Sequence, residues 1–440
     1  MPKLFGTDGV RGVANVDLTA DLALDLGRSG GIVLGPGVVC VGRDTRVSGP
    51  MLENALVAGL CSSGIEVRRL GVVPTPAVAY VTANEGLIAG AMVSASHNPV
   101  PDNGIKFFSK DGRKISEDQE QSIERLLGQL PPGLPTGTGV GTATHYEDGV
   151  QHYIAHLLSS VEGGLSGMRI VLDCAFGAAY HLGPSIFRDT GAEVIAMNAE
   201  PDGARINVDC GSTSLGQTKD RVLAEGADLG LAFDGDADRV LAVDEKGNEV
   251  DGDRIIALSA IAMHEQGKLR NDVVVSTVMA NLGFKRALEE RGIEVVQAQV
   301  GDKYVVEEMQ RRDAALGGEQ SGHIIFAEHA TTGDGILAGL QVARAVRDSG
   351  RPLSELAHVF EPVPQVLINV KVASKNKLND AAALWEEVAE VEAEMGPDGR
   401  VLLRPSGTEP VVRVMVEAVE EATARNNAQR LVDAVQRHLG

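Results

Sequence analysis

Three aspartates stand at alternate positions near the middle of the chain, at Asp234, Asp236 and Asp238. They directly follow the apolar run Leu229–Phe233, which predicts a buried strand. A regular strand would align the carboxylates on one face but too far apart to share an ion. Gly235 lets the backbone curl at the strand end, so that the oxygens converge. Hard oxygen ligands in this number suit Mg²⁺ or Ca²⁺.

Two other interpretations of this segment need no magnesium. One is a solvated acidic turn. The other is an EF-hand calcium loop, in which Glu245 would fall at the twelfth position. Arg239 stands where that loop requires glycine, and the flanking runs Leu229–Phe233 and Val240–Val243 are typical of strands, not helices. The sequence therefore favours Mg²⁺, whose open positions a phosphate oxygen and water normally fill.

A candidate to carry that phosphate is Ser96, in the loop Ser94–Pro99. Neighbouring side chains usually point apart, so the adjacent Ser96 and His97 do not predict a hydrolase triad. On spacing alone, a turn that closes a strand is the simpler interpretation. Lys106 favours Ser96 because a cation this close along the chain can neutralise phosphate charge or shuttle a proton.

A loop near the C-terminus joins two apolar runs and offers one cation, two hydroxyls and a glycine, at Arg404, Ser406, Thr408 and Gly407. Arg404 provides a planar fork and the loop a group of backbone donors, a combination that can bind phosphate. Arg413, in the next predicted strand, is a second candidate cation. An ordinary hairpin turn is the alternative.

A glycine-rich loop contains Glu319, Gln320, Ser321 and His323 but lacks the spacing of a nucleotide P-loop. These side chains suit hydrogen bonds to sugar hydroxyls, which donate and accept at fixed angles. A plain glycine turn explains the same residues.

The elements that position these loops follow from an internal repeat. A Gly-x-Glu-Val string recurs at Gly64, Gly191 and Gly292, each time after a helix-like stretch that follows an apolar, β-branched run. Strand, helix, glycine and strand in this order are typical of a βαβ unit with parallel strands. Three copies predict three α/β domains.

A fourth, smaller α+β domain is predicted after the break at Pro362 and Pro364. It begins with an alternating strand over Val366–Val372 and ends with an amphipathic helix. The Pro-, Gly- and Thr-rich stretch Gly128–Gly149 predicts a linker or a long surface connection. The predicted domains are residues 1–150 with the Ser96 loop, 151–256 with the aspartates, 257–364 with the Glu319 loop and 365–440 with the Arg404 loop.

Composition excludes several function classes. The chain has 440 residues and a formal net charge of −21, which would repel nucleic acid or an anionic lipid surface. Its 4 cysteines are scattered, without zinc or disulfide spacing. No signal-peptide pattern or membrane-spanning run is present, so we expect a cytoplasmic protein that binds a small anionic substrate in a local cationic pocket.

Together these loops resemble the α-D-phosphohexomutase superfamily, and within it the bacterial phosphoglucosamine mutases, over the whole chain. The segment Gly6–Gly12 is similar to the N-terminal signature of the family, and each of the four loops to one of its motifs. The resemblance implies three similar mixed-sheet α/β domains and a smaller C-terminal α+β domain around a central cleft.

The resemblance also implies a role for each loop. Ser96 carries the phosphoryl group, and one Mg²⁺ per chain bridges it to the three aspartates. Catalytic roles are implied for Arg11, His97, Lys106 and Arg239. Sugar contacts are implied for Glu319, Gln320, Ser321 and His323, and phosphate contacts for Arg404, Ser406, Gly407, Thr408 and Arg413. Two phosphoryl transfers through a bisphosphate would interconvert glucosamine 6-phosphate and glucosamine 1-phosphate, for UDP-N-acetylglucosamine and cell-wall precursor synthesis.

The glucosamine branch rests on fewer residues. Gln320 is similar to that branch, whereas phosphomannomutases and phosphoglucomutases usually have Met there. Lys303 and Ser214 depart from the pattern, where Arg and a larger polar residue are usual. A phosphomannomutase or phosphoglucomutase is the nearest alternative, followed by a Mg²⁺-dependent sugar phosphatase and a Ca²⁺-binding protein without catalytic activity.

The resemblance further implies phosphoserine at Ser96 and glucosamine 1,6-bisphosphate or a similar compound as activator. The sequence leaves open whether the chain forms a homodimer, and whether a kinase or self-phosphorylation primes Ser96.

Overall fold

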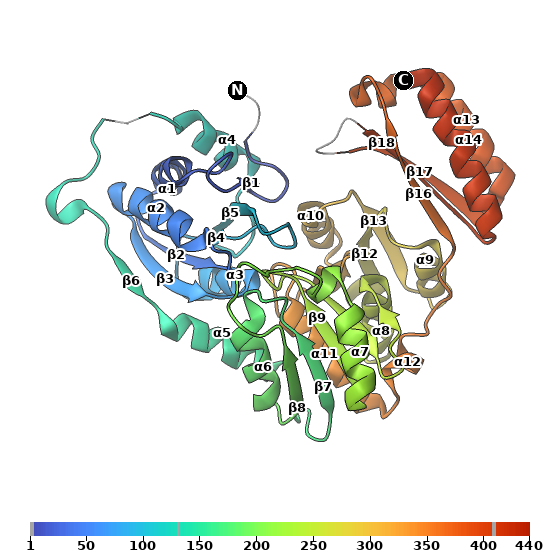
Figure 1. Cartoon of the computed structure of the whole chain (residues 1–440), viewed down its shortest axis with the longest axis horizontal. Coiled ribbons are helices and arrows are strands. Elements are labelled where there is room, and N and C mark those ends of the chain that lie inside the picture. Colours follow the sequence, from blue (N-terminus) through green and yellow to red (C-terminus); the bar gives the residue numbers. More distant parts are fainter. Residues whose placement is uncertain (1–3, 130–131, 407–410) are drawn as a thin grey trace. The chain divides into compact units, whose positions relative to one another are not determined.

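The computed structural model describes residues 4–129, 132–406 and 411–440. They form two compact units, residues 1–277 with 296–358 and residues 278–295 with 359–440. Figure 1 shows their helices and strands in sequence colours. In the described part of the chain, no helix is both long and apolar enough to cross a bilayer.

The first sheet is mixed and has six strands in the order β1-β5-β4-β2-β3-β6. Strands β2, β3, β4 and β6 run parallel to one another, whereas β5 pairs antiparallel with β4 and β1. Their bounds are β1 (Val10–Val13), β2 (Val38–Arg43), β3 (Glu66–Val72), β4 (Ala89–Val93), β5 (Asp102–Ser109) and β6 (Ala143–His145). The helices of this part are α1 (Ala20–Leu34), α2 (Gly49–Ser62), α3 (Thr75–Asn84), α4 (Glu117–Leu126) and α5 (Glu147–Ser159).

Helices α1 and α2 pack closely because glycines lie where they touch. A Cβ added at Gly27 would lie 2.1 Å from the carbonyl oxygen of Leu56, and one at Gly59 would lie 2.1 Å from that of Leu24. Backbone cannot yield to such a contact, so these two positions require glycine. The buried side chains Leu26, Leu56 and Leu60 belong to the core of this domain.

The second sheet has five strands in the order β11-β10-β9-β7-β8, with β10 antiparallel to β9. Its strands are β7 (Arg169–Asp173), β8 (Glu193–Met197), β9 (Leu229–Phe233), β10 (Val240–Asp244) and β11 (Glu249–Val250). Its helices are α6 (Ala179–Asp189) and α7 (Gly216–Glu225). Every residue of β9 and β10 is buried, as the apolar runs on either side of the aspartates predict.

The third sheet is also mixed, since β14 pairs parallel with β12 and antiparallel with β15. Its elements are α8 (Gly252–Glu265), β12 (Val273–Thr277), α10 (Asp302–Arg312), β14 (Leu316–Gly318), β15 (Ile324–Phe326), α11 (Gly335–Ser349) and α12 (Leu353–Leu356). Strand β13 (Glu294–Ala298) leads the chain from the second unit back into the first.

The second unit contains α9 (Leu282–Glu289) and a three-stranded antiparallel sheet in the order β16-β18-β17. Its strands are β16 (Gln365–Lys371), β17 (Gly399–Pro405) and β18 (Val411–Ala418), and its helices are α13 (Ala382–Met395) and α14 (Glu421–Leu439). The apolar faces of both helices share one core with the sheet, including Leu384, Val414 and Leu431. The predicted α+β domain is confirmed.

The predicted repeat is also confirmed. Gly64, Gly191 and Gly292 have φ values of 88°, 90° and 78°, a conformation that glycine adopts without steric cost, and each precedes a strand. Three mixed-sheet α/β domains therefore precede the smaller one. The predicted linker 128–149 contains regular structure, because its Ala143–His145 forms β6 beside β3 and α5 begins within it at Glu147. Three residues are too few to show strand periodicity in the sequence.

Candidate active site

The three aspartates converge where β9 turns back into β10. One carboxylate oxygen from each of Asp234, Asp236 and Asp238 lies within 4.8 Å of the others, and all three residues are buried. Between them, Ala237 has a φ of 54°, the left-handed conformation that lets the loop curl. The predicted strand-end geometry is present.

The donor set fits a hard divalent cation. The Oδ1 atoms of Asp236 and Asp238 are buried and have no hydrogen-bond partner among the residues that the structure describes. Burial and the charges of Asp238 and Asp236 raise the pKa of Asp234 well above its ordinary value. Buried like charges cost free energy, and a cation such as Mg²⁺ would offset that cost by binding these two oxygens.

Ser96 lies beside this cluster, in the loop between β4 and β5. Its hydroxyl donates a hydrogen bond to Asp234 Oδ2 at 2.6 Å, and only 1% of the residue is exposed. The φ of Ser96 is 51°, which is uncommon for a residue other than glycine. The structure therefore brings the predicted phosphoryl carrier and the predicted metal ligands together.

His97 departs from the expectation that neighbouring side chains point apart. Its Nδ1 lies 3.3 Å from Ser96 Oγ, because the left-handed backbone at Ser96 turns the two side chains toward each other. Burial, Arg239 and Arg11 lower the pKa of His97 to about 4, so the ring is neutral at pH 7. The Ser96 hydroxyl is donated to Asp234, so the pair is not arranged as a hydrolase dyad.

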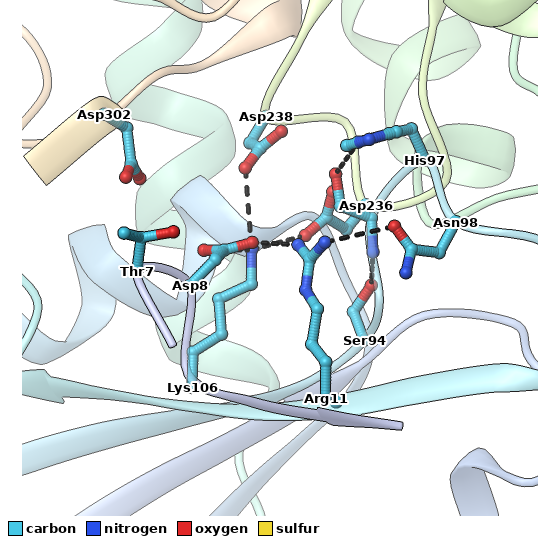
Figure 2. A network of polar contacts seen from close by, with 12 residues as sticks. Thr7, Asp8, Arg11, Ser94, His97, Asn98, Lys106, Asp236, Asp238 and Asp302 are labelled. Atoms are coloured by element: carbon cyan, nitrogen blue, oxygen red, sulfur yellow. Dashed lines mark hydrogen bonds and ion pairs between the residues drawn. The ribbon is translucent and has the colours of Figure 1, made fainter. Parts of the chain in front are cut away.

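Two cations rise from adjacent strands toward the same cluster, as Figure 2 shows. Lys106 on β5 places its Nζ 3.0 Å from Asp236 Oδ2, and Arg11 on β1 donates to Asn98 at 3.2 Å. Burial opposes the Lys106 charge, but Asp236 and Asp238 outweigh it and raise the pKa of Lys106. Lys106 is therefore an ammonium group at neutral pH.

Arg239 completes the cationic side of the cluster. Its backbone N–H donates to Asp234 Oδ1 at 3.2 Å, and its Nε lies 3.9 Å from Asp238 Oδ1. Fixed cations beside bound phosphate supply the charge neutralisation that phosphoryl transfer needs.

The predicted sugar loop joins β14 to β15, and its side chains have different surroundings. Glu319 accepts a hydrogen bond from the backbone of Gly301 at 3.1 Å, and Gln320 donates to Asp251 at 3.1 Å. Ser321 is exposed. His323 is buried, accepts from Gly333 N–H through Nε2 at 3.0 Å and places Nδ1 3.7 Å from Asp238. His323 thus faces the aspartate cluster.

The predicted phosphate loop belongs to the second unit. Arg404 on β17 and Arg413 on β18 are direct partners in the antiparallel register, so their side chains share one face of the sheet. Lys375, which the sequence reasoning missed, donates to the carbonyl of Ser406 at 2.5 Å. Gly407 and Thr408 lie outside the described residues.

Family models match all four parts of the chain. Those for α/β/α domains I, II and III of phosphoglucomutase/phosphomannomutase match residues 2–130, 151–247 and 251–363, and that for the C-terminal domain matches residues 367–434. The phosphoglucosamine mutase of Streptomyces avermitilis is 53% identical over 452 aligned positions, which cover 100% of each chain. This chain belongs to the phosphoglucosamine mutase family.

Other relatives agree with this membership. The phosphoglucosamine mutase of Geobacillus thermodenitrificans is 52% identical over 446 positions, again covering 100% of both chains. Among solved structures, a phosphoglucomutase/phosphomannomutase family protein from Burkholderia thailandensis superposes with a TM-score of 0.83 at 25% identity, over 98% of this chain and 97% of that one. The chain is thus a member of this family of isomerases and has its four-domain fold.

Arg46 is a site residue that the sequence reasoning missed. Its guanidinium is fully buried, pairs with Asp44 at 3.0 Å and donates to the carbonyl oxygens of Ser96, Asn98, Pro99 and Asp102 at 2.6 to 2.9 Å. One cation thereby shapes the whole Ser96 loop. The sequence offered one indication of this role. Asp44 and Arg46 come just after β2, and β2 lies beside β4, the strand that precedes the Ser96 loop.

Asn207, from the second domain, was also missed. Its amide donates to the carbonyl of Ser96 at 2.9 Å, so two domains hold the same peptide group. Asn207 has a φ of 60°, a conformation that asparagine tolerates better than most residues. Nothing in the local sequence indicates its target, because the contact joins residues 111 positions apart.

Lys303, which departs from the family pattern, lies on α10. It donates to Glu117 at 2.9 Å and so links α10 to α4. The Glu117 side chain is 57% exposed, and an ion pair this open to water contributes little to stability.

Proposed function

We propose that this chain interconverts glucosamine 6-phosphate and glucosamine 1-phosphate through a phosphoserine at Ser96. The observation that carries the proposal is the 2.6 Å hydrogen bond between Ser96 and Asp234, within a buried cluster of three carboxylates. A hydroxyl in this position can carry a phosphoryl group whose oxygens share a divalent cation with the aspartates. The relatives at 53% and 52% identity, both named phosphoglucosamine mutase, support this choice of substrate.

The reaction consists of two phosphoryl transfers. In the first, the bond from phosphorus to Ser96 Oγ breaks as a bond to O1 of glucosamine 6-phosphate forms, and the proton of O1 passes to Ser96 Oγ. The resulting bisphosphate turns over, and its 6-phosphate returns to Ser96 while the Ser96 proton passes to O6. The cycle therefore conserves both phosphate and protons. Its transition states are loose, so positioning and charge neutralisation supply most of the catalysis.

The residues around Ser96 divide these tasks. Lys106, Arg11 and Arg239 neutralise the charge of the transferred group. Bound by Asp234, Asp236 and Asp238, one Mg²⁺ per chain would add Lewis-acid stabilisation of the phosphoryl oxygens. His97 is neutral at pH 7, so its Nδ1, 3.3 Å from Ser96 Oγ, can accept a hydrogen bond or a proton.

Recognition of the substrate falls to the other two loops. Glu319, Gln320 and Ser321 offer acceptors and donors for sugar hydroxyls, and His323 acts beside Asp238. The Arg404 loop, with Ser406, Gly407, Thr408 and Arg413, binds the phosphate that is not being transferred. Because substrate and product present different phosphates, this loop must accept either one.

Several further assignments belong to the same proposal. The domains are residues 1–150, 151–256, 257–364 and 365–440. A glucosamine 1,6-bisphosphate activator supplies the intermediate, and the protein acts in the cytoplasm, where its product feeds UDP-N-acetylglucosamine synthesis. A homodimer, and priming of Ser96 by a kinase or by self-phosphorylation, stay predictions.

Phosphorus NMR tests the function directly. Purified protein with Mg²⁺ and a trace of glucosamine 1,6-bisphosphate would receive glucosamine 6-phosphate, glucose 6-phosphate or mannose 6-phosphate, with Ser96→Ala and an EDTA-treated sample as controls. We expect the glucosamine compound to isomerise fastest and both controls to be inactive. Faster turnover of glucose or mannose phosphates would assign the alternative mutase activity, and release of inorganic phosphate alone would refute the mutase mechanism.

A further inference from the structure

Asp8 is partly exposed to solvent, yet it has three cationic side chains as neighbours. Its carboxylate accepts from Lys114 Nζ at 2.7 Å, forms an ion pair with Arg11 and lies 3.5 Å from Lys106 Nζ. The Asp8 side chain is 26% exposed, whereas that of Lys106 is only 2% exposed. Asp8 is therefore the most solvated of the carboxylates that surround the buried Lys106 ammonium.

Lys106 lies between Asp8 and two of the aspartates assigned to the metal. Its Nζ is 3.0 Å from Asp236 Oδ2, 3.6 Å from Asp238 Oδ2 and 3.5 Å from Asp8 Oδ1. Figure 2 shows the ammonium at the meeting point of these carboxylates. A divalent cation at the aspartates would repel Lys106 and compete with it for Asp236 and Asp238. The ammonium group then needs another anion, because water does not reach it.

Asp8 is fixed in place to serve as that anion. Lys114 joins it to Asp302 through a 2.6 Å ion pair and also donates to the carbonyl of Thr7 at 3.0 Å. The Lys114 side chain is 16% exposed, so water screens these contacts only partly. A pinned carboxylate costs little reorganisation when the flexible end of Lys106 moves toward it.

We propose that Asp8 is a positioning residue that draws the Lys106 ammonium away from Asp236 and Asp238 and so makes the aspartate cluster available to a divalent cation. The inference rests on the metal site of the proposed function, and it concerns only the competition between two cations. Without the Asp8 charge, Lys106 has only the aspartates to pair with, and the cation must displace it.

A double-mutant cycle of Mn²⁺ binding distinguishes this role from a general effect of charge. Mn²⁺ affinity is measured by electron paramagnetic resonance of the full chain carrying Ser96→Ala, so that every sample lacks phosphoserine. Asp8→Asn, Lys106→Met and the double variant are compared. We expect Asp8→Asn to weaken Mn²⁺ binding about three- to tenfold when Lys106 is present and to change it less than about 1.5-fold with Lys106→Met. Lys106→Met alone strengthens binding.

The matched control is Asp111→Asn, which removes the same charge from the first domain at a carboxylate that pairs with Arg113. Its effect should be the same with and without Lys106→Met. Equal losses for Asp8→Asn in both backgrounds would overturn the proposal, because long-range charge alone would then explain them. No loss in either background, or no Mn²⁺ binding to the Ser96→Ala chain, would overturn it too.

The two hypotheses fail separately. If the unmodified chain does not interconvert the sugar phosphates but the cycle shows the expected coupling, the proposed function is wrong and the role of Asp8 stands. If the mutase reaction proceeds and the cycle shows no coupling, only the role of Asp8 is wrong. Circular dichroism of each variant verifies that it is folded.

Discussion

The Ser96 hydroxyl donates to Asp234 Oδ2 at 2.6 Å, although the two residues are 138 positions apart in the chain. Asp234 belongs to β9–β10 of the second domain and Ser96 to β4–β5 of the first, so the bond exists only when both domains are folded and in contact. Asn207 and Arg46 hold the Ser96 carbonyl from the same two domains. Ser96 is therefore placed by the interface between the domains as well as by its own loop.

Asp234→Asn should abolish activity and yet stabilise the protein in the absence of metal. The variant keeps the side-chain shape but removes one of three buried like charges, and burial and those neighbours already raise the pKa of Asp234. We expect turnover to fall about 1,000-fold or more. In EDTA, we expect the thermal unfolding midpoint to rise by about 2 °C.

Calorimetry and the phosphorus NMR assay measure these two effects, with Asp228→Asn, at a carboxylate outside the cluster, as control. An Asp234→Asn variant that is less stable than the parent in EDTA would show that the three charges do not repel one another in the folded state.

Arg46→Lys should slow catalysis without weakening substrate binding. Lysine keeps the charge beside Asp44, but one ammonium cannot reach the four carbonyl oxygens that the guanidinium binds. The Ser96 loop then loses its fixed geometry, and misplacement of a reacting group by about 1 Å can cost roughly 100-fold. We expect kcat to fall about 10- to 100-fold with KM nearly unchanged.

Steady-state kinetics of Arg46→Lys and of Arg43→Lys test this prediction. Arg43 precedes the same segment but pairs with Glu53. Equal losses in both variants would mean that any arginine in this segment matters equally, and the role assigned to Arg46 would be wrong.

The contrast between Asp234 and Arg46 explains what the sequence could predict. The three aspartates are neighbours in sequence, and strand end, glycine and alternating carboxylates are all visible within ten residues. The four β-sheet domains also have local signals, since periodicity and the repeated glycines mark their elements. Arg46, Asn207 and Lys375 act through contacts with residues far along the chain. Their targets depend on sheet order and domain packing, which no local pattern encodes.

The family resemblance supplied part of what local patterns lacked. It implied that Lys106 and Arg11 surround the transferred group, and the structure places both beside the aspartates. It implied the same for His97, whose contact with Ser96 follows from the φ of 51° at Ser96. A single backbone conformation thus reversed an expectation based on average side-chain directions.

Asp334 should make the folded protein less stable as the pH rises from about 4 to about 6. Burial raises its pKa from 3.8 to about 6, so the folded state retains a proton that the unfolded state releases. The stabilisation is fully present below pH 4 and is lost as the pH passes 6, with a total of about 3 kcal/mol. Asp334→Asn cannot titrate, yet its side chain can still accept from Leu337 N–H.

Thermal midpoints of the parent and of Asp334→Asn between pH 4.5 and pH 7.5 measure this effect. The difference, variant minus parent, should increase with pH up to about 6.5 and then level off. Tyr153→Phe, which removes the 2.8 Å hydrogen bond to Asp334, should extend the loss of stability to higher pH, because the charged form of Asp334 loses a donor. A pH-independent difference would mean that Asp334 stays charged in the folded protein.

Arg413→Met should weaken binding of glucosamine 6-phosphate and glucosamine 1-phosphate alike. Arg404 and Arg413 occupy directly opposed positions on β17 and β18, so the sheet presents two guanidinium groups on one face. A charged hydrogen bond to phosphate contributes about 1.5 to 3 kcal/mol, which corresponds to an increase in KM of about 10-fold or more. In the proposed function the loop accepts either phosphate, so the increase should be similar in both directions of the reaction.

Initial rates measured from each sugar phosphate give the two KM values, and Arg430→Met serves as the control. Arg430 lies on α14 of the same domain and pairs with Glu390 and Glu394, so its loss removes the same charge from the domain without changing β17 or β18. An Arg413→Met variant that raises only one of the two KM values would show that Arg413 recognises one substrate orientation. A residue that binds whichever phosphate is not being transferred must affect both KM values. If only one value rises, each of the two guanidinium groups binds one of the two phosphates.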